Sequence, residues 1–432
     1  MTDYDVLIIG GGFAGATVAR ELQHKGLGVL LLEARDRLGG RTWTREALGH
    51  RIELGGTWVH WVQPHVWAEI TRYGLELTQS PVPSWSRWIV DGELRKGSAE
   101  EFLGLLDGGM SRFLEDSRVR FERPYDPFHS GDLDEIDGLS VTDRLDEMGL
   151  DREQYAMTEG FWTICFNAPA GEGALTQALR WGALSMGDWQ LMLEAAATYK
   201  LAEGTRALME AIVGDGGADV QLSKPVAVVE RSEEGTTVVT RDGDRISGRA
   251  IVVTAPLNAL NGIEFRPGLS EGKRAAASEG QASRGLKVWA RVRGEMEPFI
   301  ALAPSDQPLT WVQYEYAVDG DSLILGFGPD AGQLDTNDPA AVQKAIRAWL
   351  PEAEIVESTG HDWVSDEFSR QTWPMLKPNQ LTRYLRELQR PEDGVFLAGS
   401  DYANGWMGFI DGAIESGLRV SREVNEHLSA QA

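Results

Sequence analysis

Cysteine is nearly absent from this sequence, in which Cys165 is the only one among 432 residues. A single thiol excludes an internal disulfide, a Cys-x-x-Cys redox pair and a thiolate-rich metal site. Seven histidines are present, and the spacing of His60 and His65 could bring two ligands near one ion. Because neither an HExxH motif nor an acidic residue in register accompanies them, we expect no metal site.

Long apolar runs are absent as well. No run approaches the roughly 18–20 residues that cross a bilayer, and an apolar strand starts at Tyr4, which leaves no room for a signal peptide. The composition of 42% hydrophobic and 25% charged residues is typical of a globular chain of about two or three domains. We therefore expect a soluble, cytoplasmic protein with no membrane partner.

Basic residues are fewer than acidic residues. The 41 Lys and Arg residues face 66 Asp and Glu residues, which gives a formal net charge of −25. Such a field repels nucleic acid and anionic lipid, so neither is expected as a partner. It could attract protonated amines, although an acidic surface that keeps the protein dissolved is the simpler interpretation.

Glycine, in contrast, is abundant, and its first cluster follows the apolar run "YDVLII" at residues 4–9. The cluster reads Gly10-Gly11-Gly12-Phe13-Ala14-Gly15 and leads into a helical pattern and then a second strand that ends on Glu33. In a dinucleotide-binding unit these glycines allow a tight turn, close approach to a pyrophosphate and close helix packing. The carboxylate accepts hydrogen bonds from a ribose. The motif predicts a dinucleotide site without distinguishing NAD from FAD.

More glycine turns follow. Gly39-Gly40-Arg41 comes after the second strand, Gly55-Gly56-Thr57 comes after another short strand, and "GSDYANGWMGFIDGAIESG" at residues 399–417 reads as strand end, loop and helix start. A nicotinamide dehydrogenase has no evident need for these extra turns, whereas a large tricyclic ring lying beside the backbone does. The pattern therefore favours a flavin over NAD.

Together, "GGGFAGATVARELQHKGLGVLLLEARDRLGGRTWT", "ELGGTWVH" and "FLAGSDYANGWMGFIDGAIESGLR" resemble the flavin amine oxidase family, which includes the monoamine oxidases. Within that family "GGTWVHWVQPHVWAEITRYGL", "PLTWVQYEY" and "HDWVSD…TWPMLKPNQLTR" are most similar to bacterial nicotine and 6-hydroxynicotine oxidases. The resemblance implies FAD as cofactor, a two-domain fold and oxidation of a C–N bond to an imine.

The resemblance also assigns residues to the cofactor. The first glycine loop would meet the pyrophosphate, the acidic residue at the end of the second strand would meet the adenosine ribose, and the later turns would line the flavin. These residues are Gly10, Gly12, Phe13, Ala14, Gly15, Glu33, Ala34, Arg35, Gly39, Gly40, Arg41, Gly55, Gly56, Thr57, Val226, Trp363, Gly399, Ser400, Phe409 and Ile410. Thr372 occupies the position where monoamine oxidases carry the cysteine that bonds to flavin, so the resemblance implies non-covalent FAD.

Three residues are candidates for catalysis. Trp373 and Phe409 match the two aromatic positions that flank the substrate amine, where π faces would orient it towards flavin N5. Read without the resemblance, both could be ordinary core aromatics. Lys287 shares one strand face with Trp289 and Arg291, which by itself indicates a solvated lysine. The family match instead places it beside flavin N5, where it would hold a water that assists reoxidation.

Asn167 in "FNAP" and Tyr314 in "QYEY" align with pocket residues of 6-hydroxynicotine oxidases. The substrate implied by these matches is an apolar, nicotine-like or arylalkyl amine. Its α-hydrogen would pass as hydride to flavin N5, the imine would hydrolyse, and oxygen or a protein electron carrier would reoxidise the flavin. The family also suggests a homodimer.

Other functions stay open. An L-amino-acid oxidase of the same fold needs a cation for the substrate carboxylate, for which Arg87 and Arg180 are candidates. A polyamine oxidase needs acidic residues along a tunnel, and acids are plentiful. A non-catalytic FAD-binding interaction protein would need neither the aromatic pair nor Lys287.

The expected fold is α/β, with a Rossmann-like FAD-binding domain interleaved with an α+β substrate domain. Short alternating runs between residues 217 and 256 predict strands of the cofactor domain, and the region from about 80 to 202 is helical in pattern. We expect the FAD-binding domain to comprise residues 1–79, 203–283 and 392–432. The substrate domain would comprise residues 80–202 and 284–391.

Overall fold

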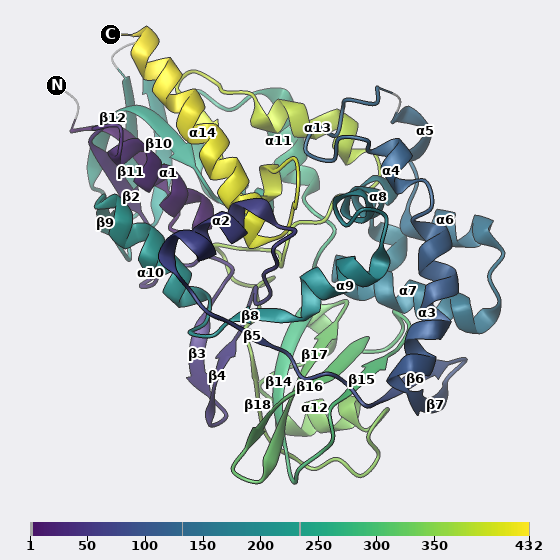
Figure 1. Cartoon of the computed structure of the whole chain (residues 1–432). Helices are drawn as coiled ribbons and strands as arrows, with labels where there is room; N and C mark the ends of the chain where they lie inside the picture. Colours follow the sequence, from purple (N-terminus) through teal and green to yellow (C-terminus); the bar gives the residue numbers. More distant parts are fainter. Residues whose placement is uncertain (1–2, 132, 233–234, 432) are drawn as a thin grey trace.

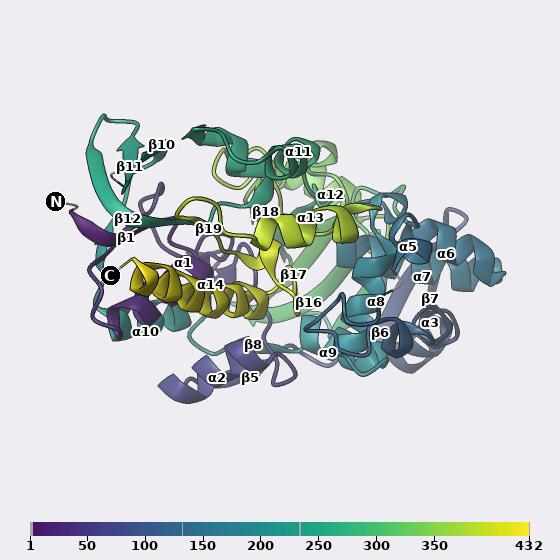
Figure 2. The same ribbon diagram turned by 90° about the horizontal axis from the view of Figure 1, so that it is seen from above.

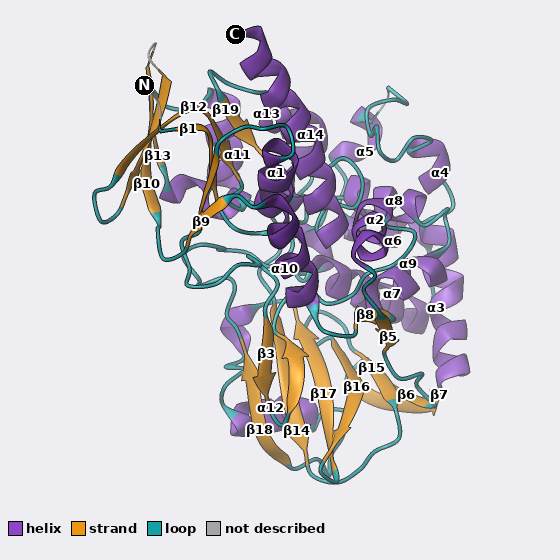
Figure 3. Ribbon diagram, turned by 60° about the vertical axis from the view of Figure 1, so that its left-hand side comes forward, coloured by secondary structure: helices purple, strands orange, loops and turns teal. Residues whose placement is uncertain are grey.

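The computed structural model describes residues 3–131, 133–232 and 235–431. These residues form two large sheets, which Figure 3 shows as separate groups of strands with a cluster of helices beside them. The first sheet has the strand order β13-β10-β11-β12-β1-β2-β9, and β19 also pairs with β12. Its strands are β1 (Tyr4–Ile9), β2 (Val29–Leu32), β9 (Asp219–Gln221), β10 (Val226–Ser232), β11 (Gly235–Thr240), β12 (Arg245–Val253), β13 (Glu264–Arg266) and β19 (Val395–Leu397).

The centre of the first sheet is parallel. β1 pairs in parallel with β2 on one side and β12 on the other, and β19 adds to β12 in the same direction. These strands are short, apolar and buried, as expected for parallel strands that are covered on both faces. Their carboxyl ends therefore meet along one edge, where the glycine loops begin.

Two helices from opposite ends of the chain cover one face of this sheet. α1 (Phe13–Gln23) and α14 (Ile410–Ala430) pack side by side, which Figures 1 and 2 both show. A Cβ atom on Gly417 would lie 2.8 Å from the backbone oxygen of Ala14. The absence of a side chain there lets the two helices touch through their backbones.

The second sheet has the order β18-β14-β17-β16-β15-β6-β7. Its strands are β6 (Trp85–Val90), β7 (Glu93–Ser98), β14 (Leu286–Val292), β15 (Phe299–Leu302), β16 (Trp311–Val318), β17 (Asp321–Gly328) and β18 (Ile355–Gly360). Leu286, Val288 and Ala290 of β14 pack in one core cluster with residues of α12 (Pro339–Ile346), while Trp289 belongs to another cluster on the opposite face. The alternation expected for this strand is thereby confirmed.

A group of helices packs against that opposite face. It comprises α3 (Ala99–Phe113), α4 (Ser117–Arg120), α5 (Asp134–Asp137), α6 (Val141–Met148), α7 (Arg152–Phe166), α8 (Leu175–Leu184) and α9 (Trp189–Ala197). Their core is rich in tryptophan, including the fully buried Trp162 and Trp189. The Ser140 hydroxyl and the Asp143 carboxylate form a reciprocal capping box that starts α6.

Shorter elements complete the chain. They are the hairpin β3 (Thr44–Ala47) and β4 (His50–Glu53), the pair β5 (Leu77–Gln79) and β8 (Tyr199–Leu201), and the helices α2 (Pro64–Tyr73), α10 (Thr205–Gly216), α11 (Glu271–Glu279) and α13 (Gln380–Gln389). Short 3₁₀ helices occur at Ala170–Glu172, Leu257–Gly262, Ala331–Gln333 and Ser400–Tyr402. Within the residues described, no helix combines the length and apolar character needed to cross a membrane.

The two sheets draw on different parts of the sequence. All strands of the first sheet fall within residues 1–79, 203–283 and 392–432, and all strands of the second fall within 80–202 and 284–391. Residues 1–2, 132, 233–234 and 432 of these segments lie outside the described residues. We keep this division as our proposal for the two domains.

Candidate active site

A long cavity lies where the two halves of the molecule meet. Nearly all of the cofactor and pocket residues predicted from the sequence line it, although they come from at least eight separate segments of the chain. Two predicted residues, Gly15 and Tyr314, are not among the residues that line it. The cavity therefore joins the glycine loops of the first half to the aromatic residues of the second.

One end of the cavity is formed by the first glycine loop. α1 starts at Phe13 with Gly12 as its N-cap, no side chain caps it, and its first turn contains no acidic residue. Its free N–H groups and positive dipole end are thus available to an anion, as a pyrophosphate requires. A Cβ atom on Gly15 would lie 2.1 Å from the oxygen of Gly10. The role of Gly15 is therefore close packing beneath the loop, and not contact with the cavity.

Glu33 fixes the geometry of this loop. Its carboxylate, which is buried, accepts hydrogen bonds from the N–H of Gly11 (2.6 Å) and the N–H of Arg35 (2.8 Å). The side chain lines the cavity, together with Val226 and Arg241. A carboxylate at the end of the second strand fits a ribose in the position where the family places one.

A second helix N-terminus reaches the cavity from the end of the chain. Phe409 is the N-cap of α14, no side chain caps this helix, and Phe409, Ile410 and Ala413 line the cavity. The Asp411 carboxylate turns away and accepts hydrogen bonds from the N–H groups of His65 and Val66 at the start of α2. The α14 dipole is thus left to act on whatever occupies the cavity.

These observations test whether the cavity fits FAD. Two uncapped helix N-termini, one at a glycine loop and one beside aromatic residues, suit an elongated ligand that has a diphosphate and a ring that accepts negative charge. Gly12 and Gly40 approach closely, since a Cβ on Gly40 would lie 3.3 Å from the Cα of Gly12. A side chain on either loop would narrow this part of the cavity. The residues present fit the cofactor.

Lys287 extends from β14 into the cavity and is 4% exposed. Its Nζ atom donates hydrogen bonds to the oxygen of Gly55 (2.8 Å) and to Oγ1 of Thr57 (2.6 Å), both in the third glycine turn. Burial lowers its pKa from 10.5 to about 7, and the nearby carboxylate of Glu53 only partly opposes this. A solvated strand lysine is therefore ruled out by its position, and Lys287 can exchange a proton near neutral pH.

The two predicted cage residues are held by different neighbours. Trp373 donates its indole N–H to the oxygen of Cys165 (2.8 Å) and makes an edge contact with the ring of Phe327. Phe409 packs edge-on against Trp181 and Trp406, with ring centroids 5.0 Å apart in each case. Both rings line the cavity, and these contacts with their neighbours fix their orientation.

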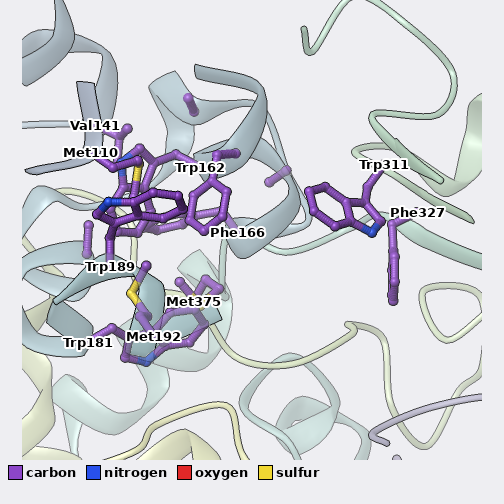
Figure 4. Packing of buried hydrophobic residues seen from close by; sticks show 14 of the residues in the cluster. Met110, Val141, Trp162, Phe166, Trp181, Trp189, Met192, Trp311, Phe327 and Met375 are labelled. Atoms are coloured by element: carbon purple, nitrogen blue, oxygen red, sulfur yellow. The ribbon is translucent and has the colours of Figure 1, made fainter. Parts of the chain in front are cut away.

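Beyond these rings, the cavity wall is apolar. Figure 4 shows Trp311 and Phe327 together on the sheet side, with Trp181 and Met192 on the helical side, and all four line the cavity. Further wall residues are Phe161, Ile164, Leu193, Ala196 and Ala197. We call this part of the cavity the amine chamber. Sequence reasoning missed these wall residues because alternation along a helix or strand cannot tell a chamber wall from a core.

Asn167 lines the chamber, as the resemblance implies. It terminates α7 in a left-handed conformation (φ 50°), its Nδ2 donates to the oxygen of Gly328 (3.0 Å), and its Oδ1 is buried without a partner among the described residues. An unpaired buried acceptor is costly, so a donor from a bound molecule would stabilise it.

Tyr314, in contrast, does not line the cavity, so the prediction that it is a pocket residue was wrong. It packs with the cluster on the α12 side of the sheet, and its neighbours Trp311 and Gln313 line the cavity instead. Alternation along β16 explains the difference, since residues 311 and 313 share the face opposite to residue 314. Alternation counted along β16 from Trp311 would have assigned Tyr314 to the opposite face.

Cys165 also lines the chamber, but burial raises the pKa of its thiol. His60 and His65 bind Glu194 and Asp411 respectively, so each ring has a carboxylate partner. Thr372 lines the cavity with its hydroxyl buried and without a partner among the residues described.

Comparison with known proteins agrees with this geometry. Residues 13–425 match the family model described as flavin containing amine oxidoreductase. The chain is 39% identical to pseudooxynicotine dehydrogenase of a Pseudomonas species, over 99% of this chain and 88% of the relative. It is 37% identical to nicotine dehydrogenase of Pseudomonas putida, over 99% and 89% of the two chains.

The fold resembles that of the solved cyclohexylamine oxidase of Brevibacterium oxydans, with a TM-score of 0.83, 23% identity and coverage of 99% of this chain and all of the other. The expected fold class, an FAD-binding α/β half combined with a substrate half, is thereby confirmed. The family match covers almost the whole chain and agrees with the two uncapped helices and the buried lysine. The chain belongs to the family of flavin-containing amine oxidoreductases, which use FAD to oxidise the CH–NH bond of an amine.

Proposed function

We propose that this enzyme oxidises a nicotine-like amine, which carries an aromatic ring and an apolar secondary or tertiary amine, with non-covalently bound FAD. The observation that carries the proposal is the amine chamber, whose walls up to the Trp373 and Phe409 rings are mostly aromatic and aliphatic. The Pseudomonas relatives named for pseudooxynicotine and nicotine support this substrate class.

When bound, FAD supplies the hydride acceptor, flavin N5, that takes the hydrogen from the α-carbon of the amine. The protein positions the amine for this transfer. Trp373 and Phe409 would hold the amine nitrogen between two π faces, where positive charge that develops on nitrogen is favoured. Since their own packing fixes both rings, the α C–H can be aligned without a strong protein base.

The chamber orders the distal ring of the substrate. Trp311 and Phe327 form one wall and Trp181 forms another, so an aromatic ring between them gains stacking and apolar burial. The unpartnered Oδ1 of Asn167 offers one directional contact to a donor on the substrate. These groups favour a flat, mostly apolar substrate with one polar end.

Lys287 would assist the reoxidation of the flavin. With a pKa of about 7, it can be present in both protonation states at neutral pH, and it would hold a water and pass a proton beside the flavin. The names of the two Pseudomonas relatives as dehydrogenases favour an electron acceptor other than oxygen.

The residue at position 372 supports non-covalent binding. Thr372 has no thiolate, and the only cysteine lies in the chamber wall with its thiol protonated. Acid precipitation of the purified protein should therefore release all of its yellow colour to the supernatant. Colour that stays with the precipitate would contradict this part of the proposal.

The chamber argues against the two alternatives within the family. Arg87 and Arg180, the candidate cations for an amino-acid carboxylate, are not among the cavity-lining residues. The carboxylates that line the cavity are Glu33, which binds the first glycine loop, and Glu367, which pairs with Arg241. Both lie where we expect the adenosine, so the described walls contain no acidic track for a polyamine. The homodimer and the cytoplasmic location stay predictions, which sedimentation and cell fractionation would test.

Anaerobic titration of the yellow protein tests the proposal. Nicotine, 6-hydroxynicotine, pseudooxynicotine, a benzylic amine, a polyamine and an L-amino acid are each added while the flavin band near ~450 nm is followed. We expect bleaching by a nicotine-type amine at the lowest concentration. Reduction by the polyamine or the amino acid alone would replace the proposed substrate class, and reduction by no amine would favour a non-catalytic flavoprotein.

A further inference from the structure

Glu315 is a buried carboxylate at an irregular point of β16, near the amine chamber but outside the cavity lining. The register of β16 against β17 shifts between Tyr314 and Tyr316, which marks a β-bulge at Glu315. The residue is 1% exposed. Bulges redirect side chains next to active sites, so we asked which groups this carboxylate binds.

One chain of hydrogen bonds connects Glu315 to the cavity through Ser80. The Trp58 indole N–H donates to Oγ of Ser80 (3.2 Å), and the Ser80 hydroxyl donates to Oε1 of Glu315 (3.1 Å). Serine carries a single hydroxyl hydrogen, so its donation to the carboxylate leaves the oxygen lone pairs for the indole. Trp58 lines the cavity, with its ring 5.4 Å from Nζ of Lys287.

A second chain connects the same carboxylate to the cavity through Gln313. The Trp311 indole N–H donates to Oε1 of Gln313, and Nε2 of Gln313 donates to Oε1 of Glu315, both at 2.5 Å. Rotating the amide by half a turn would set an oxygen against the carboxylate and an N–H against the indole N–H, so only one orientation works. Trp311 and Gln313 both line the cavity.

Lys200 neutralises the carboxylate from the other side. Its Nζ lies 2.5 Å from Oε2 of Glu315 and also donates to the hydroxyl of Tyr316 (2.8 Å), and its side chain is 6% exposed. A buried ion pair of this kind gains little over apolar residues of the same size. Its position beside the chamber suits a role other than stability.

We propose that Glu315 is a positioning residue whose Oε1 atom, acting through Ser80 and Gln313, fixes the orientation of two cavity-lining tryptophans, Trp58 and Trp311. The ends of both hydrogen-bond chains meet at this one oxygen, and Lys200 keeps the carboxylate in place. The tryptophans then present fixed faces to the substrate ring. The consequence for substrate binding rests on the proposed function, while the positioning of the two rings rests on the hydrogen bonds alone.

Two double variants that share Lys200→Met and differ only at position 315, where one keeps an acceptor oxygen and the other has none, separate this role from a purely structural one. Lys200→Met with Glu315→Gln removes both charges and keeps an oxygen where Ser80 and Gln313 donate. Lys200→Met with Glu315→Leu removes both charges and the oxygen. Any electrostatic effect on Lys287 is the same in the two, so a difference between them reports the acceptor.

The measurements are the crystal structures of both variants and anaerobic stopped-flow reduction of the flavin by the best amine of the wild-type panel. We expect the Gln variant to keep both indole orientations and the wild-type amine Kd. In the Leu variant one or both indoles should turn, and Kd should rise on the order of tenfold, while FAD content and the limiting reduction rate change less, because two buried donors lose their acceptor.

The buried pair Arg20–Glu69 between α1 and α2 is the matched control. Its partners are 0% and 3% exposed and are not among the cavity-lining residues, so Arg20→Met with Glu69→Leu should alter stability without altering the amine Kd. Unmoved indoles and an unchanged Kd in the Glu315→Leu variant would overturn the proposal, as would equal defects in both Glu315 variants. If no amine reduces the wild-type flavin, the proposed function fails, and the indole positions in the crystal structures still decide the positioning role.

Discussion

The ammonium group of Lys287 lies inside the protein, where it is hydrogen-bonded to a glycine turn and has the aromatic rings of Trp58 and Phe327 nearby. Burial lowers its pKa from 10.5 to about 7, against the opposing charges of Glu53 and Glu315. Between these two pH values the unfolded chain holds a proton that the folded protein has lost, so the free energy of unfolding rises with pH in this window. Below pH 7 both states are protonated and the full cost of the buried charge is present.

Replacing Lys287 with Met should reveal this coupling. The stability of the wild type relative to Lys287→Met should increase by about 1.4 kcal/mol per pH unit between pH 7.5 and 9.5, since the variant has no group that titrates there. Urea unfolding at several pH values, without amine, measures the slope. A stability difference that is flat with pH would contradict the lowered pKa. Lys224→Met replaces a partly exposed lysine that pairs with Asp242 and Asp244, and it should show no such slope in this range.

Single residues also show where prediction from sequence succeeds and where it stops. The alternation around Lys287 gives the correct face of β14, because a regular strand has a strict period of two. It did not reveal that this face is buried, which depends on helices far away in the sequence. The bulge at Glu315 leaves no sequence signal, so the polar groups behind the chamber could not be predicted.

Among the elements, the contact of α1 with α14 positions both helix N-termini in the cavity. A Cβ on Gly417 would lie 2.8 Å from the oxygen of Ala14 and 2.9 Å from Cβ of Thr17. Gly417→Ala should therefore push the helices apart, lower the free energy of unfolding by about 1–3 kcal/mol and weaken FAD binding. Denaturant unfolding and FAD titration of the apoprotein measure the two effects.

Gly104 in α3 is the control for this substitution, because nothing lies within 4 Å of a Cβ atom placed there. Gly104→Ala should be neutral or stabilise the protein by up to about 1 kcal/mol through helix propensity. Equal effects of the two substitutions would show that helix contact is not the cause.

The segment 361–372 follows β18, and several of its residues line the cofactor cavity. Asp366 accepts hydrogen bonds from Arg35 (2.6 Å) and from His361 (2.8 Å), with both members of the Arg35 pair largely buried. Despite the burial that opposes it, these partners lower the pKa of Asp366 to about 2. Glu367 pairs with Arg241 nearby, but both side chains are about half exposed.

Burial decides which of these pairs matters. Asp366→Asn should accelerate FAD dissociation several-fold, since it loosens a segment that lines the cavity, whereas Glu367→Gln should change it little because exposed pairs contribute at most about 1 kcal/mol. The rise in flavin fluorescence after dilution of the holoenzyme measures the rate. Comparable acceleration by both substitutions would point to general electrostatics instead of the buried pair.

For elements as a whole, the sequence predicted the parts of the cofactor site that depend on local motifs. One such part is the strand, glycine loop and helix at residues 4–23, and another is the glycine loop that precedes Ile410. Each is continuous in sequence, and the structure brings both to the cavity. The chamber walls come from α7, α8, α9, β16 and β17, which only tertiary packing brings together. Such non-local assembly has no periodic signature.

Over the whole molecule the excess of acidic side chains is large, with a net charge of −25. Self-repulsion of this size destabilises the folded state, and salt screens it over about 10 Å at 0.1 M. We expect Tm to rise by several degrees when sodium chloride is increased from low to moderate concentration. Potassium chloride should act equally if screening is the cause. A Tm that falls with salt would show that ion pairs outweigh the repulsion.

The order in which the chain contributes to the cofactor site has a consequence for its synthesis. β1 and the first glycine loop emerge early, but β19, which pairs with the central strand β12, and the helix that faces the ring end of the cavity lie beyond residue 394. A nascent polypeptide on the ribosome therefore offers a diphosphate loop while the place for the ring is still incomplete. We expect FAD to be captured late in maturation, so cells short of riboflavin should accumulate full-length apoprotein instead of truncated, arrested chains.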